Sequence, residues 1–310
     1  MSCIIESVPN VSEGRRHEVV DRIASAILGV TGVRLLDVSA DPAHNRSVYT
    51  FIGAPAAVRE AALALYTAAL ANIDMRRHRG VHPRIGAVDV LPLVPLSGAT
   101  MEDCVDLARE VGRAVAERFA LPVYFYEEAA VRPERRRLEA IRRGGFEGLG
   151  ARMADAAWSP DCGPPTPHET AGATVIGARR VLIAFNVNLA TGRLEVARRI
   201  ARVVRESSGG LPHVKAIGVA LAERGLVQVS MNLTNPAVTP LHEAFDVVAR
   251  EAARENVEIA GSEVIGLAPL DAIVATARAR LRLDDFTAGR VLEAHLPPAG
   301  EPEGRIGRDT

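Results

Sequence analysis

The chain has 310 residues, of which 37 are Lys or Arg and 38 are Asp or Glu, so its formal net charge is −1. Because this balance gives no overall field that attracts polyanions, the composition argues against a general nucleic-acid or anionic-membrane binder. Hydrophobic residues make up 48% of the chain and aromatic residues only 4%, which is typical of a globular protein with an aliphatic core.

The first half of the chain alternates short apolar strands with helical periodicity. The pattern predicts the order β-α-β-β-α-β, with elements over residues 3–8, 17–28, 33–38, 47–53, 56–73 and 87–94. The stretch D-P-A-H-N-R at Asp41–Arg46 predicts a tight turn, and therefore a hairpin between the two strands beside it. A helix over 101–119 and a strand over 123–126 extend the unit. This element order is that of a ferredoxin-like fold.

The second half of the chain repeats the pattern. It predicts strands over 180–189, 214–221, 226–233 and 258–267, and helices over 193–205, 240–254 and 270–281. Local matches in the same order, such as N-V-S-E-G at Asn10 with N-L-A-T-G at Asn188, indicate a duplication. We therefore expect an α+β protein of two tandem ferredoxin-like α/β sandwich subdomains, residues 1–179 and 180–296, each an antiparallel sheet with helices on one face. The Pro- and Gly-containing tail, 297–310, is expected to be disordered.

Residues 132–179 interrupt this repeat. Residues 132–143 predict a charged, solvated helix, and the alternative, a basic patch for nucleic acid, is weakened by its glutamates and its lack of aromatics. The stretch G-G-F-E-G-L-G at 144–150 follows a helix rather than a strand, so it predicts a helix terminator and a loop instead of a dinucleotide fingerprint. Residues 158–173, rich in Pro and Gly, predict either a binding loop or an interdomain linker.

The stretch with the most chemistry is Arg76–Arg84, where four arginines and two histidines fall within nine residues. Gly80 ends the preceding helix, and Pro83 biases His82 away from helical dihedral angles, so His82 is expected on an irregular loop. A histidine placed there can take or lend a proton near neutral pH, and the arginines can bind carboxylates. The competing interpretation is a solvated basic loop. A metal site at His78 and His82 is disfavoured because no continuous helix would bring them onto one face.

Targeting and redox signals point to the cytoplasm. The N-terminus has neither a basic segment nor an apolar segment of the kind that signal peptides use. No apolar run reaches the length of a membrane span. The cysteines, Cys3, Cys104 and Cys162, are far apart and form no C-x-x-C pair, which favours a reduced compartment and disfavours a zinc ribbon.

Several long stretches resemble the glutamate formimidoyltransferases, the folate-dependent enzymes of histidine degradation. Among them are E-S-V-P-N-V-S-E-G from Glu6, L-L-D-V-S-A-D-P-A-H-N-R from Leu35, H-R-G-V-H-P-R-I-G-A-V-D-V from His78 and W-S-P-D-C-G-P from Trp158. The resemblance implies transfer of the formimino group from N-formimino-L-glutamate to N5 of tetrahydrofolate, giving 5-formiminotetrahydrofolate and L-glutamate. It also implies a folate-binding cleft between the two subdomains, a homodimer, and tetrahydrofolate as co-substrate without a metal. We expect a stand-alone transferase that lacks the cyclodeaminase domain of animal members.

The resemblance also suggests roles for individual residues. It places the catalytic histidine at His82. Folate binding falls on the loop formed by Gly163, Pro164, Pro165, Thr166, Pro167, His168, Glu169, Thr170, Ala171 and Gly172. Family members have an acidic residue where this chain has Ser39, and we hypothesise that Asp41 supports the histidine instead. The alternative is that no carboxylate is needed.

The chemistry of the substrates suggests further contacts. Formiminoglutamate carries two carboxylates and folate ends in a glutamate, so cationic partners are required; our candidates are Arg46, Arg79 and Arg84. Candidates for hydrogen bonds to the pterin edge are Asn10, Asn45, Asn186 and Asn188, and the competing interpretation of each is simple turn chemistry.

Two other functions remain open at this stage. Formyl transfer from N-formylglutamate to tetrahydrofolate would use the same scaffold, and a non-catalytic folate-binding protein would not need His82. An RNA-binding module is disfavoured because the chain has few aromatic residues and no basic excess. We therefore expect small-molecule substrates, with neither a nucleic acid nor a membrane as partner.

Overall fold

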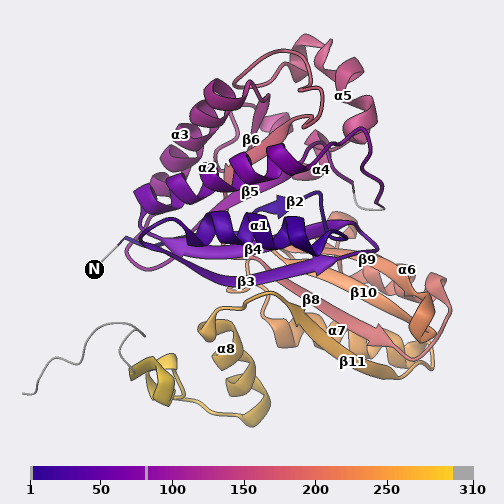
Figure 1. Ribbon diagram of the computed structural model, residues 1–310. Helices are drawn as coiled ribbons and strands as arrows, with labels where there is room; N and C mark the ends of the chain where they lie inside the picture. Colours follow the sequence, from indigo (N-terminus) through magenta and orange to yellow (C-terminus); the bar gives the residue numbers. More distant parts are fainter. Residues whose placement is uncertain (1–2, 81–82, 296–310) are drawn as a thin grey trace, which may run out of the picture. The chain divides into compact units, whose positions relative to one another are not determined.

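The computed structural model describes residues 3–80 and 83–295 (Figure 1). Its chain divides into two compact units, one ending at Val181 and the other starting at Leu182, and each is described by itself. The segment 297–310, for which we expect disorder, lies outside the described residues, and so does His82.

The first unit is built on a seven-stranded sheet. Its strands are β1 (Ile5–Ser7), β2 (Asn10–Val11), β3 (Val33–Asp41), β4 (Arg46–Gly53), β5 (Val88–Pro95), β6 (Val123–Glu127) and β7 (Thr174–Ala178). Strands β1 and β2 each pair antiparallel with both β4 and β5, and β3 pairs antiparallel with β4. β7 lies parallel between β5 and β6. The sheet is therefore mixed, and not purely antiparallel as the sequence suggested.

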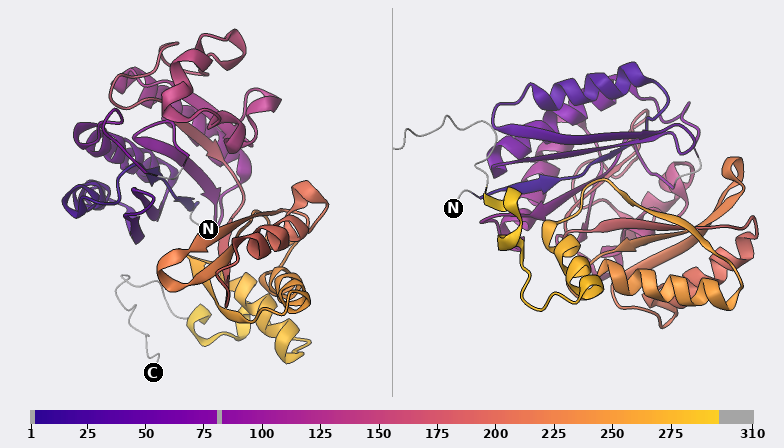
Figure 2. Two further views of the ribbon diagram at one scale, coloured as in Figure 1. Left: turned by 90° about the vertical axis from the view of Figure 1, so that its right-hand side faces the viewer. Right: turned by 90° about the horizontal axis from the view of Figure 1, so that it is seen from below.

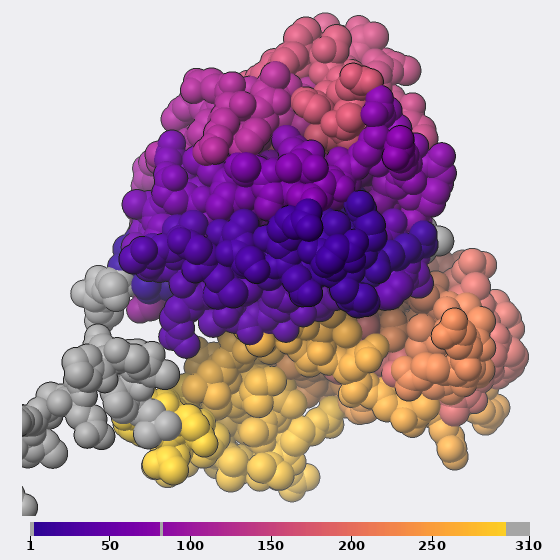
Figure 3. Space-filling view, viewed as in Figure 1, coloured from indigo at the N-terminus to yellow at the C-terminus, as the bar shows by residue number. Residues whose placement is uncertain are grey.

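Helices pack on both faces of this sheet. α1 (His17–Leu28), α2 (Pro55–Asn72) and α3 (Met101–Phe119) lie on the first face, and α1 and α2 form the indigo-to-violet surface in Figure 3. Their apolar residues form the main core with inward-facing residues such as Phe51 and Leu91. α4 (Leu138–Ile141) and α5 (Gly145–Met153) cover the opposite face behind β5, β6 and β7 (Figure 2).

Two local predictions for residues 132–179 are wrong, and one strand there was not predicted. The charged helix over 132–143 is broken into a 3₁₀ turn, Pro133–Arg135, and the single turn of α4. Gly144 and Gly145 do end that segment, but the stretch 144–150 then starts α5 instead of a loop. Strand β7 was missed because T-V-I-G-A is short and follows directly on a Pro-rich loop. Its residues are buried on both faces, which favours a short apolar run over an alternating pattern.

The second unit has a four-stranded antiparallel sheet in the order β11-β8-β10-β9. The strands are β8 (Ile183–Leu189), β9 (Val214–Leu221), β10 (Leu226–Leu233) and β11 (Ile259–Ile265), and the helices are α6 (Leu194–Val204), α7 (Leu241–Arg254) and α8 (Leu270–Leu281). The apolar side of α6 packs on the sheet through Val196, Ile200 and Val204. The first unit arranges β5, β1 with β2, β4 and β3 in the corresponding order. The strand order therefore supports the predicted internal duplication.

Among the described residues, no helix combines the length and the apolarity needed to cross a lipid bilayer. The mixed α+β architecture with two tandem units and two sheets agrees with the fold class expected from the sequence.

Candidate functional site

The loop that precedes the two undescribed residues is held against the β3–β4 turn by Asn45. This residue adopts a left-handed conformation, with φ of 50°, which asparagine tolerates better than most residues. Its side-chain oxygen accepts a hydrogen bond from the amide of Gly14 at 3.0 Å, and its side-chain nitrogen donates to the carbonyl of Arg79 at 3.0 Å. At Gly80 a Cβ atom would lie 2.2 Å from the carbonyl oxygen of His44, so only glycine permits this approach.

His78 is buried beneath this loop as a neutral ring. Its Nδ1 accepts a hydrogen bond from Nε of Arg84 at 3.1 Å, so the ring proton is on Nε2, which donates to the carbonyl of Asn45 at 2.9 Å. Burial lowers the pKa of His78 first of all, and the nearby Arg84 charge lowers it further. The ring therefore serves as an uncharged hydrogen-bonding bridge between the turn and Arg84.

This burial predicts a pH-dependent stability. Because the pKa of His78 is lower in the folded state than the ordinary value of about 6.5, the unfolded chain binds the proton first. The stabilising contribution is complete above about pH 6.5 and is lost as the pH falls from there toward the folded-state pKa. We expect His78→Gln to remove this part of the pH dependence of the free energy of unfolding. Urea unfolding between pH 5 and 8 would test it, with the exposed His17→Gln as control, and equal slopes in wild type and His78→Gln would contradict the assignment.

Arg84 joins His78 to the helix α5. Its two terminal nitrogens donate to the two carboxylate oxygens of Glu147, at 2.8 and 3.1 Å. The hydrogen bonds from Arg84 are the main reason that the pKa of Glu147 is lowered. All three guanidinium nitrogens of Arg84 thus have partners within the first unit.

A second, buried ion pair fixes the chain beyond Arg84. The carboxylate of Asp89 accepts the amide N–H of Ile85 at 2.8 Å and pairs with Arg142 from behind the sheet. Arg46 lies nearby, where burial lowers its pKa to about 10, and the charge of Arg142 adds to this effect. A small pocket beside these groups is lined by Ser12, Asn45, Arg46, His78, Arg84 and Asp89, among others.

The Pro-rich loop 163–172 is closed by its own hydrogen bonds, and its end lies beside Ala87, which directly precedes β5. Within it, His168 and Gly172 exchange two backbone hydrogen bonds of 2.8 Å, and Nδ1 of His168 accepts the amide N–H of Ala171 at 3.1 Å. Gly163 and Gly172 have φ of 87° and 72°, a region that favours glycine. Thr166 and Glu169 are exposed on this loop, whereas Ala171 is buried.

Backbone hydrogen bonds join loop 163–172 to both sides of the undescribed pair Val81–His82. On one side, the amide of Met75 donates to the carbonyl of Thr170 at 2.7 Å. On the other side, Ala87 donates to Ala171 at 3.0 Å, and Ala173 donates to Ile85 at 3.1 Å. A Cβ atom at Gly86 would lie 1.9 Å from the carbonyl oxygen of Ala173, so this contact requires glycine. Arg76 and Glu169 add an ion pair between the two loops.

In the second unit, polar side chains line up on the sheet face opposite the helices. The side-chain nitrogen of Gln228 donates to the side-chain oxygen of Asn188 at 2.9 Å and to the carboxylate of Glu263 at 2.8 Å. Asn186 donates to the same carboxylate at 3.3 Å. Three neighbouring strands therefore present a row of amide and carboxylate groups.

Comparison with known proteins identifies the family. Residues 4–179 match the protein family described as "Formiminotransferase domain, N-terminal subdomain". Residues 184–288 match the family described as "Formiminotransferase domain". This chain belongs to the formiminotransferase family.

Relatives with names from this family align with most of this chain. Glutamate formimidoyltransferase from Streptococcus pyogenes is 43% identical over 297 residues, which are 96% of this chain and 99% of that protein. The protein of the same name from Thermoplasma acidophilum is 46% identical, over 97% of this chain and 99% of its own length. Formimidoyltransferase-cyclodeaminase from Rattus norvegicus is 46% identical over 280 residues, 88% of this chain and 52% of the animal protein.

The structure brings several of the candidate substrate-binding residues together in the first unit. Asn45, Arg46 and Arg84 line one pocket, and Arg79 lies exposed on the adjacent loop. Asn10 is buried in β2 and donates to the carbonyl of Val8 at 2.8 Å. Asn186 and Asn188 belong to the second unit, so their relation to this group stays a prediction.

Asp41 ends β3 and is half exposed. Its carboxylate accepts the amide N–H groups of Ala43 and His44, at 2.8 and 3.0 Å, and pairs with the imidazole of His44. Burial works against ionisation here, but these hydrogen bonds outweigh it and lower the pKa of Asp41. Its support of His82 stays a prediction.

Sequence reasoning missed several partners in these polar groups. Glu147 lies 63 residues from its partner Arg84, and Arg142 lies 53 residues from its partner Asp89, so no local sequence pattern indicates either pair. The position of Gln228 could have been predicted, because the apolar residues of L-V-Q-V-S-M-N-L alternate and place Gln228 on the face of β10 away from the core.

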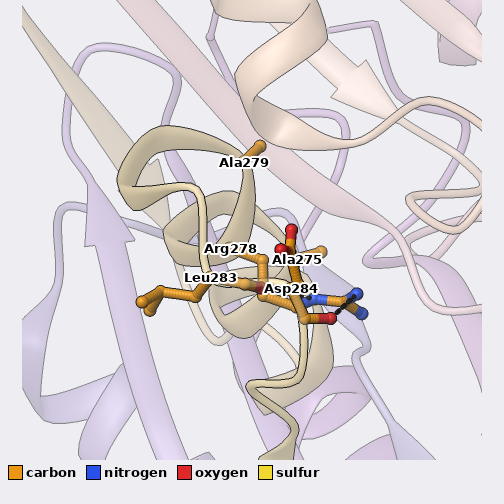
Figure 4. Close-up of a pocket in the computed structure, with 5 residues that line it drawn as sticks. All are labelled: Ala275, Arg278, Ala279, Leu283 and Asp284. Carbon is orange, nitrogen blue, oxygen red and sulfur yellow. Dashed lines mark hydrogen bonds between the residues drawn. The ribbon is translucent and has the colours of Figure 1, made fainter.

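A surface hollow beside α8 offers little chemistry (Figure 4). It is formed by α8 and the residues after it, with Ala275, Arg278, Ala279, Leu283 and Asp284 as its lining. Arg278 donates to the carbonyl of Asp284 at 2.9 Å, so its charged head is used locally. No group of three or more His, Cys, Asp or Glu side chains suited to a metal occurs within residues 3–80 and 83–295.

Proposed function

We propose that this protein transfers the formimino group of N-formimino-L-glutamate to N5 of tetrahydrofolate and releases L-glutamate, in the degradation of histidine. The observation that carries the proposal is the junction between loop 163–172 and the residues flanking His82. Family resemblance assigns folate binding to the loop and proton transfer to His82, and three backbone hydrogen bonds join the loop and Ala173 after it to Met75, Ile85 and Ala87. A junction of this kind fits a co-substrate bound beside the acid–base group.

The reaction needs one group that both takes and gives a proton. N5 of tetrahydrofolate attacks the amidine carbon, so a C–N bond forms and N5 must lose its proton. The intermediate then breaks the bond from that carbon to the glutamate nitrogen, which must gain a proton to leave as an amine. His82 accepts the first proton and donates the second, because an imidazole with a pKa near 7 does both efficiently. Asp41 assists it.

Substrate binding is assigned to the cationic and amide groups. Arg46, Arg79 and Arg84 bind carboxylates of formiminoglutamate or of the folate tail, since guanidinium groups bind them through paired hydrogen bonds. Asn10, Asn45, Asn186 and Asn188 bind the pterin edge. In the second unit, Gln228 and Glu263 extend the row that contains the last two. No step requires a metal.

We further assign each half a ferredoxin-like fold, with the folate cleft formed by both. The strand orders β5-β1-β4-β3 and β11-β8-β10-β9 support this assignment of the fold. A cytoplasmic homodimer completes the proposal. The three cysteines, all unpaired, fit a reduced compartment.

The donor decides between the proposed reaction and its nearest alternative. With tetrahydrofolate as acceptor, we expect N-formimino-L-glutamate to be used and N-formyl-L-glutamate to be turned over at least about a hundredfold less efficiently in kcat/KM, a difference of about 3 kcal/mol. Absorbance of the folate products and released glutamate would both be measured. Preference for the formyl donor would replace formimino transfer by formyl transfer. Folate binding without turnover of either donor would indicate a carrier.

A further inference from the structure

The ion pair between Arg84 and Glu147 is asymmetric. The side chain of Arg84 is 11% exposed, whereas that of Glu147 is 64% exposed. A nearly buried guanidinium therefore presents its two terminal nitrogens outward, to a carboxylate that comes from the solvent side. Nε of Arg84 donates a hydrogen bond to Nδ1 of His78 at 3.1 Å, and this bond fixes the plane of the guanidinium group.

Glu147 lies in the first turn of α5, close after two glycines. It is the third residue of α5, and Gly144 and Gly145 before it have φ of 87° and 63°. A Cβ atom at Gly145 would lie 3.1 Å from the carboxylate of Glu147, so the glycine leaves room for that carboxylate on the fork. The apolar residues Leu149 and Met153 anchor the rest of α5 in the core, so the side chain of Glu147 can leave while the helix stays.

Arg84 needs an anion whenever Glu147 leaves. A cation this poorly exposed is stable only with a charge partner, and removing that partner from a buried pair is costly. Its hydrogen-bond partner on the other side, His78, is a neutral ring whose pKa is lowered by burial and by Arg84 itself. A ligand carboxylate would satisfy the same two terminal nitrogens with the same bidentate geometry.

We propose that Arg84 is a carboxylate-binding site for the glutamate part of a substrate, and that Glu147 occupies it until the ligand carboxylate displaces it. This inference rests on the proposed function, which supplies two glutamate-bearing ligands, formiminoglutamate and the folate tail. Their shared chemistry is a glutamate carboxylate. The side chain of Glu147 thus acts as an internal competitor, which we call the Glu147 latch.

A purely structural role for the pair predicts the opposite kinetic result. If Glu147 only fastens α5 to the loop, its removal would loosen the site and raise KM or lower kcat. If it competes with the ligand, its removal frees Arg84 and lowers KM. A site that is open only one time in ten binds its ligand about tenfold more weakly than an open site, so relief of about three- to tenfold is expected.

The test compares four variants: Glu147→Gln, Arg84→Gln, the double variant, and Glu128→Gln as control. Glu128 forms an exposed pair with Arg136 away from this site, with 41% of its side chain exposed. KM would be measured for formiminoglutamate, and for tetrahydrofolate with one and with several glutamates. We expect Glu147→Gln to lower one of these KM values three- to tenfold with kcat within about twofold, and Arg84→Gln to raise the same KM at least about tenfold.

The double variant should behave like Arg84→Gln, because the latch acts only through Arg84. The substrate whose KM responds identifies the source of the carboxylate. An unchanged or raised KM in Glu147→Gln overturns the proposal. If the wild type transfers no formimino group, the proposed function fails separately, and calorimetric titration with glutarate still decides the latch: tighter binding by Glu147→Gln supports it, and equal binding overturns it.

Discussion

Replacing His82 by alanine is expected to lower formimino transfer by about a hundred- to ten-thousandfold while tetrahydrofolate still binds. The expectation follows from proton accounting, because N5 must lose a proton and the leaving amine must gain one. Without a positioned base and acid, both transfers must use solvent. Stopped-flow or steady-state formation of 5-formiminotetrahydrofolate gives the rate, and fluorescence or calorimetric titration gives folate affinity.

The exposed His17→Ala variant provides the control, since it removes an imidazole at the start of α1. It should retain wild-type turnover. The pH–rate profile adds a second readout: the limb of kcat that reflects His82 should disappear in His82→Ala, whereas a variant that is merely misfolded would keep the profile at reduced amplitude. Full turnover in His82→Ala would remove the histidine from the mechanism and leave the junction of the two loops without its proposed chemistry.

Residues close in sequence explain why much of the fold could be predicted. The strands Val214–Leu221 and Leu226–Leu233 and the helix Leu270–Leu281 were predicted with the observed bounds, because alternation or helical periodicity and turn residues agree there. The hairpin of β3 and β4 was predicted for the same reason. β7 and α5 were not, since a five-residue buried strand has no period and a Gly-rich helix has low intrinsic propensity.

For the candidate site too, the features that depend on local sequence could be predicted and the contacts between distant segments could not. Loop 163–172 stood out because Pro and Gly cluster there, and the Arg- and His-rich segment stood out by composition. Their mutual hydrogen bonds depend on β7, which returns the chain beside β5 and brings Ala171 to Ala87. No local pattern contains that pairing. The alternation argument for Asp41 likewise could not foresee that its carboxylate caps the turn through Ala43 and His44.

Arg135→Met is expected to lower the free energy of unfolding of the first unit by about 3–5 kcal/mol, because it leaves a buried carboxylate without its partner. The Arg135 side chain is 0% exposed, and it donates to Asp161 at 2.6 Å and to the carbonyls of Ala157 and Ser159 at 2.7 and 2.6 Å. The Asp161 side chain is only 5% exposed, and its other oxygen accepts the amide of Phe125. These contacts fix the chain that leads into loop 163–172, so folate binding should weaken together with stability.

The neighbouring Arg136→Met is the matched control for this loss. Arg136 pairs with Glu128 in solvent, with 58% of its side chain exposed, and such pairs contribute at most about 1 kcal/mol. The chain has one tryptophan, Trp158, and the guanidinium of Arg135 lies 5.7 Å from the centre of the indole ring. Tryptophan fluorescence therefore reports unfolding of this unit directly. Adding Asp161→Asn to Arg135→Met should recover part of the loss, because the asparagine oxygen can still accept the Phe125 amide without an unpaired charge. Equal stability of the two arginine variants would show that the buried pair contributes no more than an exposed one, and the stability of the loop would then have to come from the backbone hydrogen bonds to Met75, Ile85 and Ala87 alone.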